Sequence, residues 1–389
     1  MTKLVHYQRI IKMKRSTCNI KVGGRQYAVG KMFLLRIFFV LGFLFSGVIA
    51  FANEETKADS ASGKIAATEE HAGKTEKFSA GKLIMGHIAD SHEWHIYGSE
   101  ENPVAIPLPV IIYNKTKGLS IFSSSRFEHG HASYNGYKLD DGKIISEDGS
   151  AIYDLSITKN VMAIFIAAAL LLFIFIGIAK MYTRNPDKAP SGFQNAIEPM
   201  ILFVRDDIAK AAIGEKNYAK FMPYLLTIFF FIWINNILGL IPVFPGGANV
   251  TGNIAIPLVL ASCTLLITLF YGNKHYWQHI LAMPGVPKAV LIILTPLEVL
   301  GIFLKPFVLM IRLFANILAG HIVVLVFFCL IFVAGAASAG AGLGAAIPSV
   351  AFTIFINGLE LLVGFLQAFV FTFLSAIYFG MATAKPEHH

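Results

Sequence analysis

The residues most able to do chemistry lie inside an apolar stretch long enough to cross a bilayer. Residues 307–328 read FVLMIRLFANILAGHIVVLVFF and include Arg312, Asn316 and His321. A charged side chain at the centre of a bilayer costs roughly 2.5–3.5 kcal/mol on insertion scales. The guanidinium of Arg312 also keeps its proton, so its charge is permanent. We therefore expect Arg312 to face a water-filled path or another protein, as an electrostatic barrier or a counter-ion.

Further polar residues on the same segment follow at helical spacings. Glu298, Lys305 and Arg312 are seven residues apart, which keeps them near one face of a helix. Asn316 shares that face with Arg312. His321 is nine residues beyond Arg312, so it points to the opposite side. The spacing predicts a stripe around Arg312 and a separate position for His321.

The last apolar segment carries a second set of polar residues: Asn357, Glu360 and Gln367. Glu360 and Gln367 are seven residues apart and share a helix face. The two segments run antiparallel, which places His321 about 14 Å outside Arg312. By the same rise, Glu360 lies about 10 Å outside Gln367, and Glu298 about 21 Å inside Arg312. We predict an outer pair, a central Arg and Gln level, and an inner carboxylate.

Two interpretations of these groups stay open on the residues alone. In the first, His321 and Glu360 line a proton path from the outside, and Arg312 blocks it where an inner path marked by Glu298 begins. In the second, the groups form a buried polar network between packed helices and satisfy one another. Arg312 favours the first interpretation because nothing structural requires a cation at that depth. Lys305 is interpreted as a residue at a kink or one that extends to the membrane interface.

The composition is that of a membrane protein with a smaller polar portion. Of its 389 residues, 55% are hydrophobic and 14% are charged, against about 25% charged in an ordinary soluble domain. The net charge is +8, but the basic residues sit at the N-terminus and in loops. We therefore expect no nucleic-acid binding. The three cysteines (Cys18, Cys263 and Cys329) lie far apart, without disulfide or zinc spacing, and no cofactor is expected.

The first 158 residues divide into three parts by composition. Residues 1–52 are predicted to be a signal peptide or leader, because a basic stretch and a short apolar run end in Ala50-Phe51-Ala52. Met32 is an alternative start, and an uncleaved anchor is the alternative interpretation. Residues 53–80 lack large apolar side chains and predict a disordered linker. Residues 81–158 contain short β-type runs broken by Gly, Pro and Asn, which predict a small strand-rich extracytoplasmic domain.

Histidines are frequent in that predicted domain: His87, His92, His95, His129 and His131. The zinc motif HExxH places two histidines four apart on one helix face. His92 and His95 are three apart in a strand-like context, so they are expected to point to opposite faces. Structural or surface roles are favoured, and no metal site is predicted. A membrane-anchored metalloprotein remains an alternative that stoichiometric zinc on residues 81–158 would support.

Residues 159–389 predict a mainly α membrane domain with five crossing segments. These lie at about 160–182, 221–244, 255–272, 288–334 and 348–384. The last two exceed the ~20 residues needed to cross, so they are expected to be long and tilted. The uncharged residues 335–347 predict a turn between them.

Loop charges predict the orientation of these segments. The loops at 180–220 and 272–288 contain Lys or Arg, whereas those at 245–255 and 335–347 contain neither. Cytoplasmic loops carry the excess of basic residues. We therefore predict a multi-pass protein of the cell inner membrane, with a periplasmic N-terminal domain and a cytoplasmic C-terminus.

The polar segments resemble subunit a of rotary F-type ATP synthases. The resemblance rests on IRLFANILAGH with Arg312 and Asn316, and on PLEVLGIFLKP with Glu298. It also rests on INNILGLIPVFPGGANVTGNIAIPLVLA and on ELLVGFLQAFVFTFLSAIYFGMA, which carries Glu360 and Gln367. It extends from roughly residue 160 to the C-terminus and leaves the N-terminal 159 residues unassigned.

The resemblance implies a stator subunit that holds two offset half-channels against a rotating c-ring. Arg312 would face the ion-carrying carboxylates of the ring, supported by Asn316 and Gln367, and Glu298 would mark the cytoplasmic half-channel. The implied partners are the c-ring subunits, the peripheral stalk b subunits, the F1 catalytic head and membrane lipid. The subunit would have no catalytic site of its own, and no GxxxxGK[ST] nucleotide loop is present.

The same resemblance assigns His321 and Glu360 to the outer half-channel. Many bacterial members carry Glu on the fourth span and His on the fifth, and here the two types are exchanged. The exchange keeps one of each, which fits a pair that works as a unit. The alternative is a secondary transporter with an intramembrane charged site, although no inverted repeat is apparent between the halves.

Overall fold

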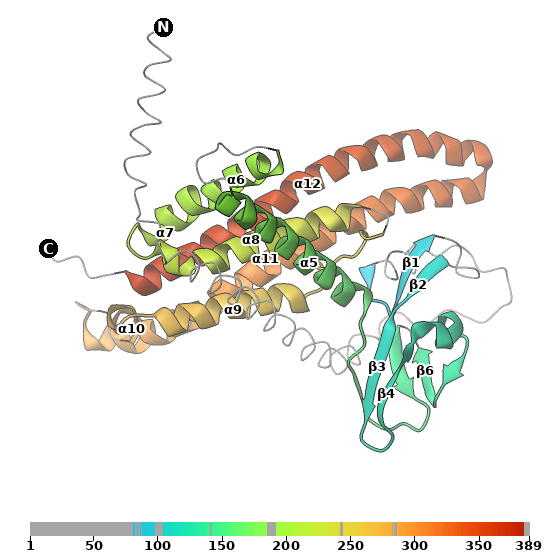
Figure 1. The fold of residues 1–389 in the computed structure, drawn as a ribbon, viewed down its shortest axis with the longest axis horizontal. Coiled ribbons are helices and arrows are strands. Elements are labelled where there is room, and N and C mark those ends of the chain that lie inside the picture. Colours follow the sequence, from blue (N-terminus) through green and yellow to red (C-terminus); the bar gives the residue numbers. More distant parts are fainter. Residues whose placement is uncertain are drawn as a thin grey trace, which may run out of the picture.

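The computed structural model describes residues 81, 84, 86, 88–97, 104–140, 142–184, 192–241, 244–281, 283 and 286–384. The predicted leader, the predicted linker and His87 lie outside these residues. Long helices make up one part of the molecule, and a β-rich unit lies beside the start of helix α5 (Lys159–Arg184) (Figure 1). This is a polytopic helical protein with a β-rich N-terminal region, as the sequence predicts.

The β-rich unit is built from three small antiparallel sheets. The two-stranded sheet pairs β1 (Glu93–Tyr97) with β2 (Val104–Pro107). The second has the order β4-β3-β8, from Gly118–Ser123, Pro109–Asn114 and Ile152–Asp154. The third has the order β5-β6-β7, from Ser133–Tyr134, Tyr137–Asp140 and Lys143–Ser146. A 3-10 helix, η1 (Ser124–Gly130), follows β4, and the shared core consists of Val110, Ile112, Phe127, Tyr137 and Ile144.

Histidines in this unit bind carboxylates. The buried His92 places Nε2 2.9 Å from Oδ2 of Asp154, and His129 places Nδ1 2.6 Å from Oε2 of Glu93. His95 is exposed on β1. Within the described residues, no three His, Cys, Asp or Glu side chains are grouped so as to hold a metal ion.

Asp154 makes the β-rich unit sensitive to acid. Burial of its carboxyl opposes ionisation, but hydrogen bonds from His92 and Ser156 outweigh burial and hold the pKa of Asp154 below its ordinary value. A lowered folded pKa stabilises the fold fully above the ordinary Asp pKa of about 4, and this stabilisation is lost as the pH falls through the folded value.

We expect Asp154→Asn to speed amide hydrogen exchange in β3 and β8 about tenfold at pH 7, because a hydrogen bond to a charged group contributes about 1.5 kcal/mol. The difference from the native chain is expected to shrink in strong acid, where both side chains are neutral. Asp148→Asn is the matched control, since its ion pair with Lys117 is exposed and contributes little. Equal exchange in the Asp154 and Asp148 variants would contradict this role.

Nine helical elements follow among the described residues, several of them long and apolar. They are α5 (Lys159–Arg184), α6 (Phe193–Phe203), the π-helix η2 (Val204–Lys210), α7 (Ala211–Ile213), α8 (Tyr218–Leu240), α9 (Ala255–Tyr271), α10 (Lys274–Leu281), α11 (Lys288–Ala337) and α12 (Ala339–Thr383). Helices α5, α8, α11 and α12 are each long and apolar enough to cross a membrane. Helices α9 and α10, bent by 104° at their junction, make a fifth crossing if they count as one span. The helix count thus agrees with the five predicted segments when the bent pair is included.

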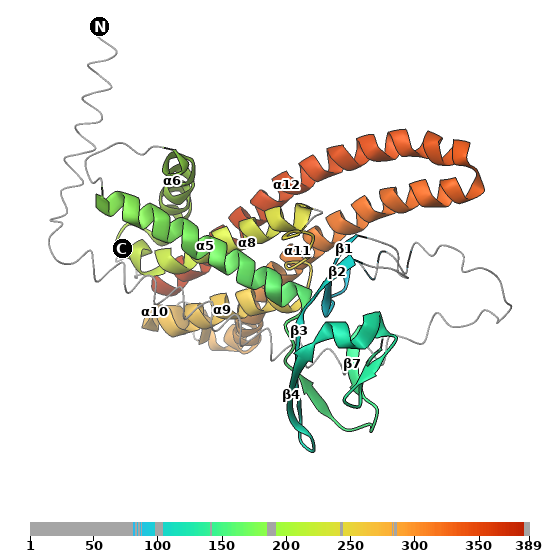
Figure 2. The same cartoon turned by 45° about the vertical axis from the view of Figure 1, so that its right-hand side comes forward.

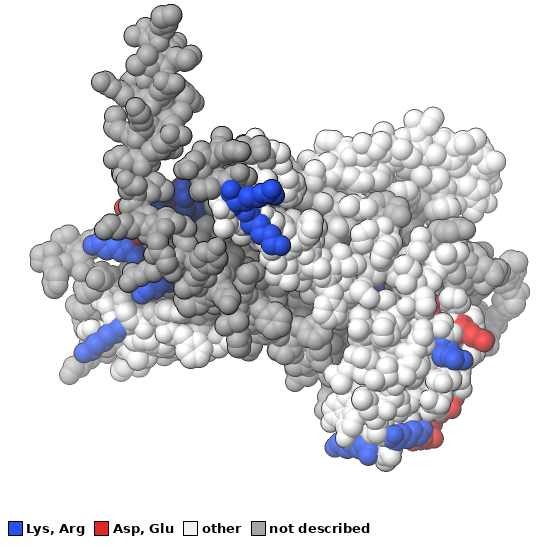
Figure 3. Space-filling model, viewed as in Figure 1, with Lys and Arg blue, Asp and Glu red and all other residues white. Residues whose placement is uncertain are grey.

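Charge is distributed unevenly over the described surface. On the face shown in Figure 3, the visible Lys, Arg, Asp and Glu lie mainly on the β-rich unit and at the opposite end of the helices, and the described surface between them is largely uncharged. A largely uncharged surface between two charged ends is typical of a protein that spans a membrane.

The hairpin of α11 and α12 corrects one prediction. The chain reverses at Ser338, so the predicted turn lies within 335–347, but it is shorter than predicted because helix covers the rest of the segment. The Ser338 hydroxyl accepts a hydrogen bond from the Ala341 amide at 3.1 Å and caps α12. Alanine favours helix, and a Cβ on Gly342 would lie 2.8 Å from the Cα of Gly335. The Ala and Gly composition therefore reflects close helix packing near the reversal.

The hairpin helices are much longer than a bilayer is thick. Helix α11 has 50 residues and α12 has 45, which correspond to about 75 Å and about 68 Å. A hydrocarbon core is about 30 Å thick. Both helices run side by side and extend past the other helices in Figures 1 and 2. They must therefore tilt, bend or project from the membrane.

Candidate functional site

The register of α11 against α12 decides which polar residues lie at the same level. Three contacts fix it: Phe327 with Phe352, His321 with Glu360, and Lys305 with Tyr378. Arg312 lies between Lys305 and His321 on α11, and Gln367 lies between Glu360 and Tyr378 on α12. Arg312 and Gln367 therefore occupy the same section of the antiparallel hairpin.

Helix α11 has an inward and an outward face at this level. Leu309, Leu313 and Ile317 are 1–3% exposed and form an inward stripe with a spacing of four residues. His321 continues this stripe and is partly buried, whereas Arg312 and Asn316 are exposed. The guanidinium of Arg312 thus lies on the outer surface of an apolar helix, where only a partner or water compensates its charge.

His321 and Glu360 lie together in a tight enclosure. His321 Nε2 is 3.7 Å from Oε1 of Glu360, and Glu360 is 8% exposed. A Cβ on Gly320 would lie 2.9 Å from the same Glu360 oxygen, so only glycine permits this approach. Helix α8 approaches the pair closely at Gly239. A Cβ atom added to this glycine would lie 3.5 Å from Nε2 of His321. The pair is therefore confined by α8, α11 and α12.

Next to this pair is a hydrogen-bond network that the sequence analysis did not select. Asn236 on α8 is buried, and its Nδ2 donates to the carbonyl oxygen of Gly364 on α12 at 3.1 Å. The Thr251 hydroxyl donates to Oδ1 of Asn236 at 2.7 Å. Gly364 is one helical turn from Glu360, so the network fixes α12 close to the carboxylate. The adjacent asparagines 235 and 236 in an otherwise apolar span were the available signal.

Two predicted residues remain: Gln367, at the level of Arg312, and Glu298, near the start of α11. Gln367 is buried with 4% exposure. Glu298 is partly buried and within electrostatic range of Tyr276 on α10. It lies about 35 Å along α11 from His321, so the structure does not bring it to the outer pair.

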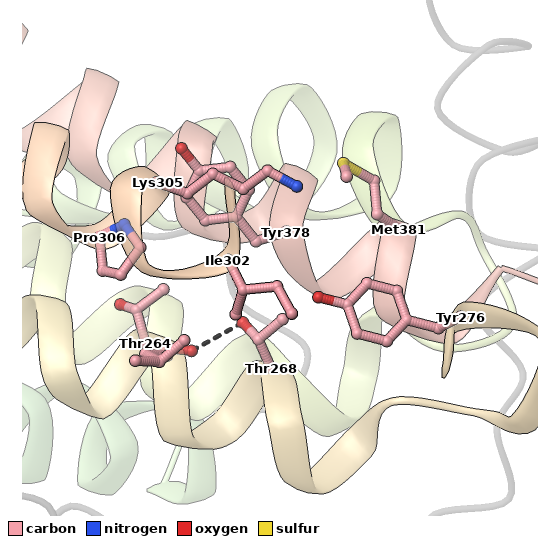
Figure 4. Close-up of a pocket in the computed structure, with 9 residues that line it drawn as sticks. Thr264, Thr268, Tyr276, Ile302, Lys305, Pro306, Tyr378 and Met381 are labelled. Carbon is pink, nitrogen blue, oxygen red and sulfur yellow. Dashed lines mark hydrogen bonds between the residues drawn. The ribbon is translucent and has the colours of Figure 1, made fainter. Parts of the chain in front are cut away.

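Lys305 lines a pocket between α9, α10, α11 and α12. Figure 4 shows it beside Pro306, with Thr264, Thr268, Tyr276, Tyr378 and Met381 around it. Its Nζ is 5.9 Å from the centre of the Tyr378 ring, within cation–π distance. The Lys305 side chain therefore packs against α12 near an internal proline.

Comparisons with known proteins identify the helical part. A family model described as "ATP synthase A chain" matches residues 161–380, which is 220 of 389 residues. The chain belongs to this family. A second model, described as a domain of unknown function (DUF8433), matches residues 83–162, a span that contains the described β-rich unit.

Several curated proteins resemble the same helical part. ATP synthase subunit a from one strain of Chlorobium phaeobacteroides is 43% identical over 242 residues, which cover 61% of this chain and 68% of that protein. ATP synthase subunit a 2 from Chlorobaculum tepidum is 46% identical over 243 residues, or 61% and 66% of the two chains. ATP synthase subunit a from Myxococcus xanthus is 41% identical over 242 residues, or 61% and 76%.

Family membership settles the class of protein. The chain is a multi-pass membrane protein of the F0 sector of ATP synthase, which translocates protons. The secondary-transporter alternative has no support among these matches.

Proposed function

We propose that this chain holds two offset aqueous half-channels against the c-ring and that Arg312 separates them. The observation that carries the proposal is the exposure of Arg312 on the outward face of α11, opposite the packed Leu and Ile stripe. Ala315, Asn316 and Ala319 are exposed on the same face. Small side chains beside the arginine leave room for a partner helix to approach closely.

The charge of Arg312 explains how the two paths stay separate. A positive charge within a few ångströms stabilises the ionised form of a carboxyl group on the partner. A protonated carboxyl group therefore gives up its proton when it reaches Arg312. Arg312 cannot take up this proton in its place, because the guanidinium is always protonated. A proton therefore has no direct route past Arg312 and crosses only on the moving partner, with Asn316 and Gln367 supporting the arginine.

We assign the outer half-channel to His321 and Glu360, and the cytoplasmic one to Glu298. The outer pair is supported by two titratable groups 3.7 Å apart, enclosed by three helices. The inner assignment is supported by the position of Glu298 near α10, which begins with Lys274 in a basic loop. The positive-inside rule then favours a cytoplasmic C-terminus and a periplasmic β-rich unit.

Purification of the intact assembly tests the partners. Affinity-tagged chain extracted from the cell inner membrane in mild detergent is expected to carry a ring of small c subunits, the b subunits of the peripheral stalk and an ATPase head. Recovery of the chain alone, under conditions that keep the ring intact, would contradict the proposal.

Gly320→Ala tests whether the position of Glu360 matters. The added methyl group would overlap Oε1 of Glu360 and displace the carboxylate. We expect ATP-driven proton pumping to fall roughly tenfold or more, since small misplacements of reacting groups are costly. Gly301→Ala on the same helix is the matched control, because its added methyl group meets nothing within 4 Å. Equal pumping by both variants in fully assembled complexes would argue against the role of Glu360.

A further inference from the structure

The outward side of the β4-β3-β8 sheet is apolar. Side chains alternate along a strand, and Val110 and Ile112 of β3 point inward and are fully buried. Five residues at the alternate positions of the three strands or directly after β8 carry large apolar side chains that are 37–66% exposed: Tyr113, Leu119, Ile121, Tyr153 and Leu155. The other exposed outward positions are Pro109 and Ser123. We call these five residues the apolar sheet face.

The apolar sheet face is continuous and uncharged. Tyr113 pairs with Leu119 on one side and with Tyr153 on the other, and Ile121 lies opposite Ile111. None of the outward residues of these three strands is Asp, Glu, Lys or Arg. One-sided antiparallel sheets normally place polar residues outward, so an apolar outer face of this kind indicates a binding surface.

The apolar sheet face is directed away from the core of the β-rich unit. The core of the unit lies on the inner side of the sheet. There Val110 and Ile112 pack with Phe127 of η1, Tyr137 of β6 and Ile144 of β7. In Figure 1, one end of β3 lies next to the start of α5 and β6 lies beyond it, while the β3–β4 hairpin extends away from the helices. The outer side of the sheet is therefore opposite the side on which β6 and β7 pack.

The chain itself holds this sheet at the membrane boundary. Only four residues separate the end of β8 at Asp154 from the start of the spanning helix α5 at Lys159. That junction is fixed by Asp90, whose carboxylate accepts from the Thr158 hydroxyl at 2.7 Å and from the Asn160 amide at 3.1 Å. The sheet cannot move far from the bilayer surface.

A second attachment restricts the tilt of the unit. Trp94 of β1 is 3% exposed and packs edge-to-face on Phe244, between α8 and α9, with ring centres 5.2 Å apart. Two attachments, at α5 and at the α8–α9 connection, leave the apolar sheet face beside the helices and uncovered by the described protein.

We propose that the apolar sheet face rests on membrane lipid in the headgroup region of the leaflet next to the start of α5. Tyrosine rings suit this region because they are apolar with a polar tip, and Tyr113 and Tyr153 lie side by side on the face. The β3–β4 hairpin ends in the exposed Lys115, which suits anionic headgroups, and in Lys117, which is ion-paired with Asp148. On α5, which begins four residues after β8, Phe165 and Phe173 are exposed apolar side chains.

Spin labels in the assembled complex test this contact. Ile121→Cys and, separately, Leu119→Cys are made with the native cysteines replaced, labelled with a nitroxide and reconstituted in phosphatidylcholine and phosphatidylglycerol vesicles. Lipid admits oxygen and excludes a water-soluble nickel chelate. We expect the ratio of oxygen to nickel accessibility to be at least about threefold higher at both positions than at Lys138→Cys, an exposed position on β6.

Two results would overturn the proposal. A ratio at positions 119 and 121 equal to that at 138 would show a face in water. Exclusion of both reagents would show that protein covers the face, either another subunit or a second copy of this chain. Two labelled positions on one face guard against a single substitution that disturbs the strand.

Discussion

Arg312→Ala is expected to abolish ATP-driven proton pumping in membrane vesicles, while the detached catalytic head still hydrolyses ATP. Without the fixed charge on the outward face of α11, nothing favours ionisation of the partner carboxylate at that level. The protonated carboxyl group of the partner then passes from one path to the other without releasing its proton at the level of position 312. Pumping is measured by quenching of a pH-sensitive dye in inverted vesicles, and hydrolysis by phosphate release.

Two matched variants separate charge from packing. Arg312→Lys keeps a cation, but an ammonium in a low-dielectric site can lose its proton, so we expect strongly impaired pumping. Asn316→Ala, one turn away on the same exposed face, is expected to reduce pumping without abolishing it. Coupled pumping retained in Arg312→Ala would refute the assigned role of the arginine.

The second large effect concerns the outer pair. His321→Glu alone places two carboxyl groups where the native atoms are 3.7 Å apart, and Glu360→His alone places two imidazoles there. Like charges at such a distance cannot both ionise, so each single change is expected to lower pumping by roughly tenfold to a hundredfold. The double exchange restores one group of each type and is expected to retain more activity than either single change.

A double-mutant cycle measures this coupling. Residues in contact typically couple by about 0.5–3 kcal/mol, whereas distant residues act additively. His321→Glu combined with Glu298→His serves as the control, because these positions lie about 35 Å apart along α11. Additive losses in the His321 and Glu360 exchange would argue against a pair that works as a unit.

Much of the fold could be predicted because its signals are local. Length and apolar composition located the spanning helices, and alternating runs between turn residues located the strands of the β-rich unit. The turn at 335–347 was predicted too long, since Gly and Ala also occur where two helices pack closely, and the contact of Gly335 with Gly342 requires the other helix. The span predicted at 255–272 ends at the bend between α9 and α10, but the apolar pattern does not contain the angle of 104°.

For the candidate site, positions along one helix could be inferred and contacts between helices could not. A spacing of nine residues separates His321 from Arg312 on α11 whatever the partner helix is. The hydrogen bond from Asn236 to Gly364 joins residues 128 apart in sequence, and the packing of Trp94 on Phe244 joins two separate parts of the chain. Such contacts depend on how elements pack, which periodicity does not contain.

The central claim is that the outward face of α11 around Arg312 meets the c-ring. The most direct measurement is disulfide cross-linking in the assembled complex, between Ala315→Cys and a cysteine one turn from the membrane carboxylate of a c subunit. Phe173→Cys, exposed on α5, is the control. We predict rapid cross-linking from position 315, none from position 173, and loss of proton pumping on oxidation. The absence of a cross-link from position 315 in complexes that pump protons before oxidation would contradict the account.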